Sequence, residues 1–92
     1  MMPVHPGRIL KRELTSRGLS ANRLALALRL PSGRITDILN CKRAISADTA
    51  LRLARYFGNS AQFWANLQSA YDLAIAEREH GERIATEVQP AA

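Results

Sequence analysis

Polar side chains that can contact a nucleic acid gather in the middle of this 92-residue chain. Short or hydrogen-bonding residues come first, and they are typical of a helix that enters the major groove of DNA: Ser32, Gly33, Arg34, Thr36 and Asp37. An amide and two cations follow, and such groups contact phosphates: Asn40, Lys42 and Arg43. Within the first group, Arg34 can donate two hydrogen bonds to a guanine, and Asp37 can accept one from a cytosine amino group.

The charge of the chain is divided unevenly along its length. The net charge is +5, from 13 basic and 8 acidic side chains, and the sequence pI is near 10.4. Residues 1–43 hold nine basic and two acidic side chains, a net of +7, whereas the remaining residues hold four basic and six acidic ones, a net of −2. We therefore expect the first part to face an anionic partner and the second part to face another protein chain.

Composition excludes several other kinds of site. The single cysteine cannot form an intrachain disulfide, and the two histidines lie far apart, so we expect no metal and no cofactor. No nucleophile or carboxylate stands at a catalytic spacing from His5, which predicts that the chain is not an enzyme and that His5 is structural. No apolar run approaches the ~18 residues that cross a bilayer, and no signal pattern is present, so we expect a cytoplasmic protein without membrane contact.

Helix start and stop signals divide the sequence into five helices. Ser20, Ser46 and Ser60 are candidate N-caps, and Gly18 and Gly58 are candidate stops. The predicted helices cover about residues 7–17, 20–28 and 32–40, then the segment between Ser46 and Gly58, and finally about 60–79. We expect an all-α domain over residues 1–80, and a flexible tail over residues 81–92 because these have no apolar face.

The second and third predicted helices have the spacing of a helix-turn-helix. The small Ala25 lets the two helices cross closely, and apolar residues fill the angle between them: Leu24, Leu28, Leu30, Ile35 and Ile38. Two residues at the start of the second helix are further candidates for phosphate contacts, Ser20 and Arg23. Ser20 also suits a cap alone, and Arg23 also suits a solvated surface.

A set of short motifs extends over residues 5–75. The motifs are His5-Pro6-Gly7 with Ile9-Leu10, then Gly18-Leu19-Ser20, the segment from Arg34 to Asn40, the segment from Ala47 to Gly58, Phe63-Trp64 with Asn66-Leu67-Gln68, and Tyr71-Asp72-Leu73. Together they resemble the HigA-type antitoxins, a branch of the lambda-repressor-like (XRE) helix-turn-helix proteins. The resemblance covers more than two thirds of the chain and implies a five-helix lambda-repressor-like fold.

The resemblance implies two activities. Antitoxins of this branch bind a RelE-like (HigB-type) ribosome-dependent mRNA endonuclease and block it. As dimers they also bind palindromic operator DNA and repress the operon that encodes both proteins. Carried over to this sequence, the base contacts fall on Ser32, Gly33, Arg34, Thr36 and Asp37, and the phosphate contacts fall on Asn40, Lys42 and Arg43. The two recognition helices of a dimer are expected about 34 Å apart.

Three positions depart from the wider family pattern. Arg29 stands where a glycine is usual in the turn, Cys41 where a glycine is usual after Asn40, and Pro31 where serine is common. The first two positions therefore require a residue other than glycine to adopt any left-handed conformation, which is uncommon. Asp37 adds a negative charge that phosphates repel, although it can also discriminate against wrong sequences.

The fifth predicted helix carries an apolar stripe: Phe63, Trp64, Leu67 and Tyr71. We expect these residues in the core first, and part of the stripe at a homodimer interface, because the family pairs through its C-terminal region. Two alternatives stay open. One is a stand-alone XRE repressor with no toxin, and the other is a toxin-binding protein whose DNA binding is weak.

Overall fold

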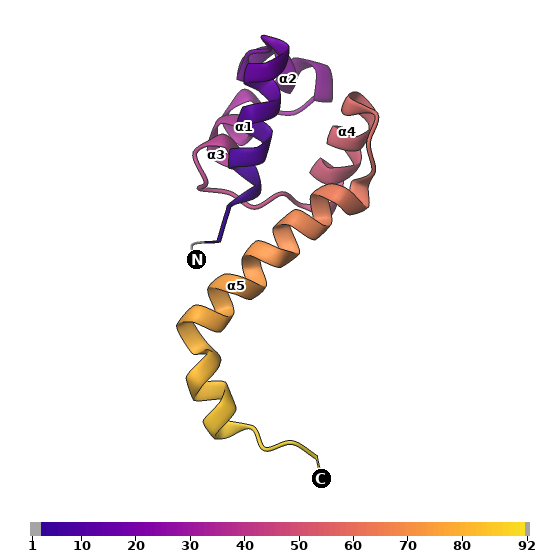
Figure 1. Cartoon of the computed structure of the whole chain (residues 1–92). Helices are drawn as coiled ribbons and strands as arrows, with labels where there is room; N and C mark the ends of the chain where they lie inside the picture. Colours follow the sequence, from indigo (N-terminus) through magenta and orange to yellow (C-terminus); the bar gives the residue numbers. More distant parts are fainter. Residues whose placement is uncertain (1–2, 92) are drawn as a thin grey trace.

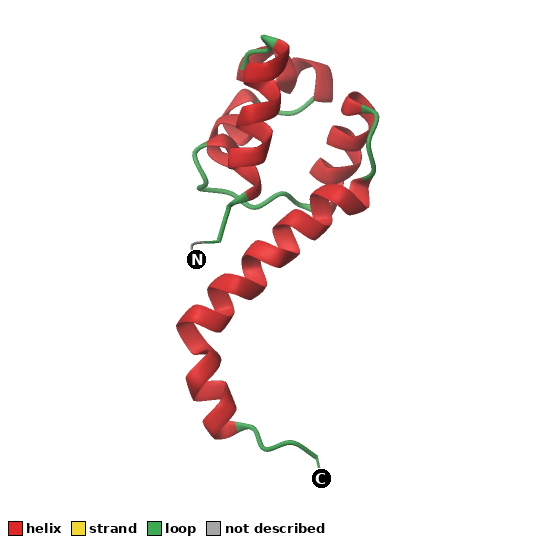
Figure 2. Cartoon of the chain, viewed as in Figure 1, coloured by secondary structure: helices red, strands yellow, loops and turns green. Residues whose placement is uncertain are grey.

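Five helices make up the fold in the computed structural model, which describes residues 3–91, and no strand occurs among these residues (Figures 1 and 2). The helices are α1 (Pro6–Arg17), α2 (Ala21–Leu28), α3 (Ser32–Leu39), α4 (Ala47–Phe57) and α5 (Ala61–Glu87). The predicted all-α fold is confirmed, and the first four helices begin and end close to their predicted positions. The long α5 projects from the body of the other helices, so the molecule measures 52 × 22 × 21 Å (Figure 1).

The predicted serine caps are present. Ser20, Ser46 and Ser60 precede α2, α4 and α5, and each side-chain oxygen accepts a hydrogen bond from the backbone N–H three residues further on, at 3.0 to 3.2 Å. Each of these bonds satisfies a donor that the first turn of a helix leaves without a partner. The starts of these three helices are therefore set by local sequence.

His5 has the structural role that its position predicts. Its Nδ1 accepts a hydrogen bond from the backbone N–H of Gly7 at 2.9 Å and so caps α1. The imidazole is buried, and its ring meets Tyr71 edge to face with 4.9 Å between ring centroids. Burial lowers the pKa of His5 below its usual 6.5, while the carboxylate of Asp72 raises that pKa by a smaller amount. The imidazole is thus held in the neutral form that its capping role requires.

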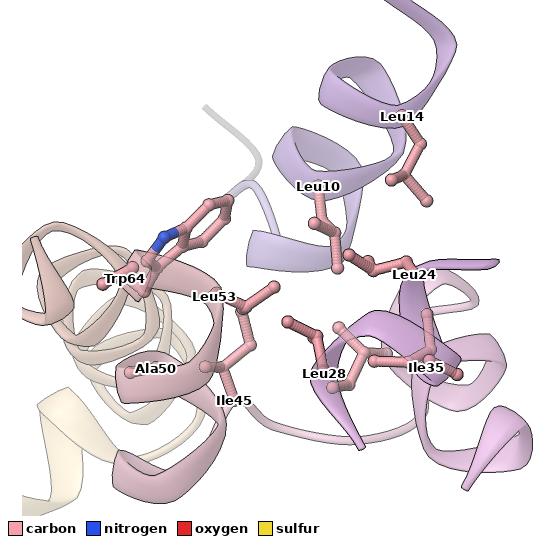
Figure 3. Packing of buried hydrophobic residues seen from close by; sticks show 12 residues of the cluster. Leu10, Leu14, Leu24, Leu28, Ile35, Ile45, Ala50, Leu53 and Trp64 are labelled. Atoms are coloured by element: carbon pink, nitrogen blue, oxygen red, sulfur yellow. The ribbon is translucent and has the colours of Figure 1, made fainter. Parts of the chain in front are cut away.

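One apolar core joins all five helices (Figure 3). Its buried members are Leu10, Leu14, Leu24, Ala25, Leu28, Ile35, Ile38, Ile45, Ala50, Leu53, Ala54 and Trp64. The largest, Trp64, is 1% exposed, and its Nε1 donates a hydrogen bond to the Asn59 side-chain oxygen at 2.9 Å. The indole N–H of Trp64 therefore has a hydrogen-bond acceptor although the ring is buried, and α5 packs against the core without an unsatisfied donor.

The length of α5 corrects the sequence prediction. The helix does not end at about residue 79, before Gly81, but continues through Gly81 to Glu87. A glycine inside a helix costs only about 1 kcal/mol relative to alanine, and the alanines, glutamates and arginines around Gly81 favour the helix. Of the predicted tail 81–92, residues 88–91 lie beyond the helix, and Ala92 lies outside the described residues. The flexibility of that tail stays a prediction.

Candidate DNA-binding surface

The turn between α2 and α3 is closed by a left-handed arginine. Arg29 has φ 60° and ψ 42°, its N–H bonds to the carbonyl of Leu26 at 3.2 Å, and the N–H of Leu30 bonds to the carbonyl of Ala25 at 3.0 Å. This pair of bonds is the Schellman arrangement in which helices usually place glycine. Arg29 thus adopts the left-handed conformation that is uncommon for a residue other than glycine, and the turn forms without the usual glycine.

Burial divides α3 into an inner and an outer face. Ile35 and Ile38 are completely buried against α1 and α2. On the outer side Ser32, Gly33 and Thr36 are exposed. A side chain built at Gly33 would meet nothing within 4 Å, so this part of the helix is open to a ligand as large as a nucleic acid.

The other two predicted base contacts lie at the edges of that face. Arg34 and Asp37 are partly buried rather than fully exposed. No hydrogen bond or ion pair within residues 3–91 uses the guanidinium of Arg34 or the carboxylate of Asp37. Both groups are therefore available to a partner.

Thr36 presents its two side-chain groups differently. Its hydroxyl donates to the backbone carbonyl of Ser32 at 3.1 Å, one helical turn earlier. The hydroxyl hydrogen is thereby used in a hydrogen bond within the helix. The methyl group of this exposed side chain makes no hydrogen bond and can contact an apolar group of a ligand. At the helix start, Pro31 supplies no side-chain cap, so the first N–H groups of α3 have no side-chain partner.

The loop after α3 also contains a left-handed residue. Cys41 has φ 62°; its N–H bonds to the carbonyl of Ile38 at 3.0 Å, and the N–H of Lys42 bonds to the carbonyl of Asp37 at 2.8 Å. This is the second departure from glycine, and Cys41 here takes the left-handed conformation in spite of its Cβ atom. The bonds fold the chain back over the end of α3, and Asn40, Lys42 and Arg43 are all exposed there. Three of the five predicted phosphate-binding residues thus lie in this exposed loop, and the other two, Ser20 and Arg23, lie at the start of α2.

Two contacts that position α3 and its loop were missed by sequence reasoning. A Cβ atom built at Gly7 would overlap the backbone carbonyl oxygen of Ile38, so α1 and α3 approach closely at a residue that only glycine suits. Gln68 of α5 is buried, and its side-chain oxygen accepts a hydrogen bond from the N–H of Ile45 at 2.8 Å. Neither contact has a local signal, because its partners lie more than twenty residues apart.

A third contact joins α4 to the helix-turn-helix. The Nη1 atom of Arg52 donates to the carbonyl of Leu28 at 2.9 Å, and its Nε donates to the carboxylate of Asp48 at 2.8 Å. Arg52 thereby satisfies a carbonyl at the end of α2 that the helix itself leaves open. Arg52, which helps to hold the end of α2, lies outside the basic segment of residues 1–43.

The ion pairs of residues 3–91 avoid the helix-turn-helix. Ion pairs join residues one helical turn apart, Glu13 with Arg17, Asp48 with Arg52 and Arg83 with Glu87. In α5 the Nε2 atom of His80 also lies 3.9 Å from a carboxylate oxygen of Glu79. None of these contacts involves Arg23, Arg29, Arg34, Lys42 or Arg43. These cations therefore have no acidic partner within the described residues and can pair with an anion outside the chain.

The predicted dimer residues do not share one surface. Trp64 lies in the core of its own chain and leaves no surface for a partner, so its assignment to a dimer interface is corrected. Leu67 and Tyr71 are half-buried, Leu67 against the same core and Tyr71 against His5. Phe63 is 43% exposed and is the one member of the set that presents a large surface.

The described residues contain no group of three histidine, cysteine or acidic side chains able to hold a metal ion. Within the same part of the chain, no helix is both long and apolar enough to span a bilayer.

Comparison with known proteins agrees with this arrangement. The helix-turn-helix family model matches residues 10–64. Virulence-associated protein I of Dichelobacter nodosus is 54% identical over 80 residues, which cover 86% of this chain and 74% of that protein.

Two solved structures are similar over nearly their whole length. One is an addiction module antidote protein of the HigA family from Coxiella burnetii, with a TM-score of 0.95 and 51% identity over 99% of this chain and all of the other. The second is the antitoxin HigA of Pseudomonas aeruginosa with its higBA promoter, with a TM-score of 0.95 and 47% identity over 98% and 99% of the two chains.

Proposed function

The chain belongs to the helix-turn-helix family and to its HigA branch, and from this premise we propose that it binds a palindromic operator as a homodimer and represses its own operon. We further propose that it neutralises a RelE-like (HigB-type) mRNA endonuclease toxin. Both activities belong in the cytoplasm. The observation that carries the DNA-binding proposal is the outer face of α3, where exposed or uncommitted polar groups are flanked by cations without internal partners.

Base contacts are assigned to the outer residues of α3. Arg34 donates to a guanine and Asp37 accepts from a cytosine amino group. Because the Thr36 hydroxyl hydrogen is donated to Ser32, we assign to this exposed side chain an apolar contact of its methyl group with the C5-methyl of a thymine. Ser32 and Gly33 approach the groove most closely, since nothing in the chain covers them.

Phosphate contacts are assigned to both sides of the recognition helix. Asn40, Lys42 and Arg43 lie in the loop beyond α3, and Arg23 and Ser20 lie at the start of α2. The Ser20 oxygen accepts the capping bond from the Arg23 N–H, which leaves its own hydrogen free to donate to a phosphate. Contacts on both sides of the helix fix its register in the groove.

The homodimer is assigned to the outer side of α5 rather than to the Trp64 side. A shallow cleft of about 480 Å³ runs between the start of α4 and α5, and small side chains line much of it: Ala47, Ala65, Ser69 and Ala76. Beside them Leu73 is 69% exposed. A protruding leucine next to small residues suits pairing with a second copy of the same surface. The cleft also includes Ile45, which follows the phosphate-binding loop two residues after Arg43.

The toxin is assigned to the part of the chain that carries a net negative charge. Residues 44–92 have a net charge of −2, and the exposed end of α5 holds Glu79, Glu82 and Glu87. A basic protein such as a RelE-like toxin complements this surface. Co-expression with the product of a neighbouring RelE-like reading frame tests the assignment: the two proteins are expected to purify together. If no RelE-like gene lies next to this one, a stand-alone XRE repressor without a toxin is favoured.

Measurement of operator affinity against salt concentration tests DNA binding. Replacing Lys42 and Arg43 together by alanine is expected to weaken binding to all sequences and to reduce the magnitude of the slope of log K against log salt by about 3.6, because each lost phosphate contact removes roughly 0.9 and a dimer loses two contacts from each protomer. Arg55→Ala, which removes an exposed cation from α4, is the control and should leave the slope unchanged. An unchanged slope in the double variant would refute the phosphate assignment. Weak binding by the unaltered chain would favour a toxin-binding protein with little DNA affinity.

A further inference from the structure

A second cationic surface lies beside the proposed DNA-binding face, at the start of α1. It is a cleft of about 530 Å³ lined by residues that come from four parts of the chain: Pro3, Val4, His5, Arg8, Arg12, Cys41 and Tyr71. None of the phosphate contacts assigned above includes a residue of α1. The cleft is thus a separate feature that the proposed recognition of DNA leaves unexplained.

The two arginines of the cleft have no internal counter-ion. Arg8 and Arg12 are one turn apart on α1, both are exposed, and no hydrogen bond or ion pair among residues 3–91 engages either guanidinium. The acid nearest to them on α1, Glu13, is paired with Arg17 at 2.9 Å. The nearby Asp72 accepts a hydrogen bond from Gln68 at 2.9 Å. Like charges one turn apart repel each other, so this pair favours an anion from outside.

The rest of the cleft is held in place by tertiary contacts. The Nδ1 atom of His5 accepts the capping bond from Gly7, which places the proton of the neutral imidazole on Nε2, as a donor. Tyr71 packs against the same ring. The floor of the cleft is therefore preorganised, and only the two long arginine side chains have to be ordered when an anion binds.

The position of the cleft connects it to the recognition helix. Gly7, next to Arg8, touches the carbonyl of Ile38 near the end of α3. Cys41 lines the cleft and directly precedes Lys42 and Arg43 in the chain. An anion held by α1 would consequently lie beside those held by the loop after α3.

We propose that this cleft binds a phosphate group through the guanidinium groups of Arg8 and Arg12, and that in the operator complex this group is a backbone phosphate next to those contacted by Lys42 and Arg43. Guanidinium groups match the geometry of phosphate oxygens and donate two hydrogen bonds at a time. The assignment of the phosphate to DNA rests on the proposed function. The ability of the cleft to bind a phosphate group does not depend on that function.

The salt dependence of operator binding tests the DNA source. The variant with Arg8→Gln and Arg12→Gln is expected to reduce the magnitude of the slope of log K against log salt by about 3.6, because a dimer loses two contacts from each protomer, and to weaken binding at 0.15 M salt. The variant with lysine at both positions keeps the charge and should keep most of the slope. Arg55→Gln, in a groove between α2 and α4, is the matched control for a lost surface charge. Equal thermal unfolding temperatures show that the variants remain folded.

A titration with inorganic pyrophosphate, without DNA, tests the alternative source. The amide signal of Cys41 and the Nε signals of Arg8 and Arg12 are followed by NMR in the unaltered chain and in the double glutamine variant. Saturable shifts that vanish in the variant, with an unchanged operator slope, would support the cleft as a site for a free phosphorylated ligand. An unchanged slope together with no saturable shift would overturn the proposal. If the unaltered chain does not bind operator at all, the proposed repressor function fails, and the pyrophosphate titration still decides the cleft.

Discussion

The helix-turn-helix and the α4–α5 pair use their polar side chains in opposite ways. Between residues 20 and 43 the elements are held by apolar packing and by two left-handed turns, while Arg34, Asp37 and the cations of the loop make no internal bond. In α4, α5 and the turn between them, three polar side chains bond to other parts of the chain: Arg52 to Leu28, Gln68 to Ile45, and Asn59 to Trp64. In this fold most buried polar groups have a hydrogen-bond partner within the chain. Polar side chains without such a partner therefore indicate the surface that binds another molecule.

The second region also positions the first. Two of its side chains reach across to backbone atoms of the recognition unit, at the end of α2 and in the loop after α3. Disturbing either region should therefore affect DNA binding, but for different reasons. Four substitutions or conditions test this contrast, from the largest expected effect to the smallest.

Replacing Gly7 by alanine should destabilise the fold most, by about 3 kcal/mol, because the added methyl group overlaps the carbonyl of Ile38 and forces α1 away from α3. Urea unfolding measures the change. Gly33→Ala is the matched control: its methyl group meets nothing, and helix propensity should raise stability by about 0.5–1 kcal/mol while operator affinity falls. Equal stability changes at the two glycines would refute the close contact.

Replacing Gln68 by alanine should cost about 2 kcal/mol of unfolding free energy, because the buried N–H of Ile45 loses its acceptor. The loop that carries Lys42 and Arg43 should also lose order, which weakens operator binding beyond the loss of stability. Gln62→Ala removes an exposed glutamine from the same helix and should change both quantities little. If both variants behaved alike in urea unfolding and operator titration, Gln68 would not anchor the loop.

Replacing Cys41 by glycine should raise the unfolding free energy by about 1 kcal/mol, since glycine takes the left-handed conformation without the steric cost of a Cβ atom. Cys41→Ala keeps that cost and should change stability little. Chemical denaturation of the two variants separates strain at the backbone from loss of the thiol. A lower stability for the glycine variant would show that the turn carries no strain.

The smallest effect concerns pH. Because burial holds the pKa of His5 below the 6.5 of the unfolded chain, the unfolded state binds more protons, and stability should fall as the pH is lowered from 7.5 through 6.5 towards 5. His5→Asn keeps a cap acceptor that does not titrate, and its stability should vary less over this range. Thermal unfolding at several pH values gives the comparison. Parallel curves for the two proteins would show that His5 does not contribute.

The two regions also differ in how far sequence alone describes them. In the helix-turn-helix, the starts and stops of the helices and the polar outer face follow from signals within a few residues of each other, whereas the left-handed conformations of Arg29 and Cys41 were established by the structure. In α5 the stripe of Phe63, Trp64, Leu67 and Tyr71 has the same helical period whether it faces the core or a partner. Periodicity gives the face of a helix but not its neighbour, and for this reason Trp64 was misassigned to the dimer interface.

The sequence by itself determined the five helices, the capping serines, a structural role for His5 and the separation of a basic half from a slightly acidic one. These features depend on local hydrogen bonds and on charge counts, which need no knowledge of how helices cross. Only the tertiary structure decided the contact of Gly7 with Ile38 and the hydrogen bond by which Gln68 holds the loop after α3. It also decided the burial of Trp64 and the cleft that Arg8, Arg12 and Cys41 line together. Each of these joins residues that are distant along the chain, and their meeting is fixed by the packing of one shared core.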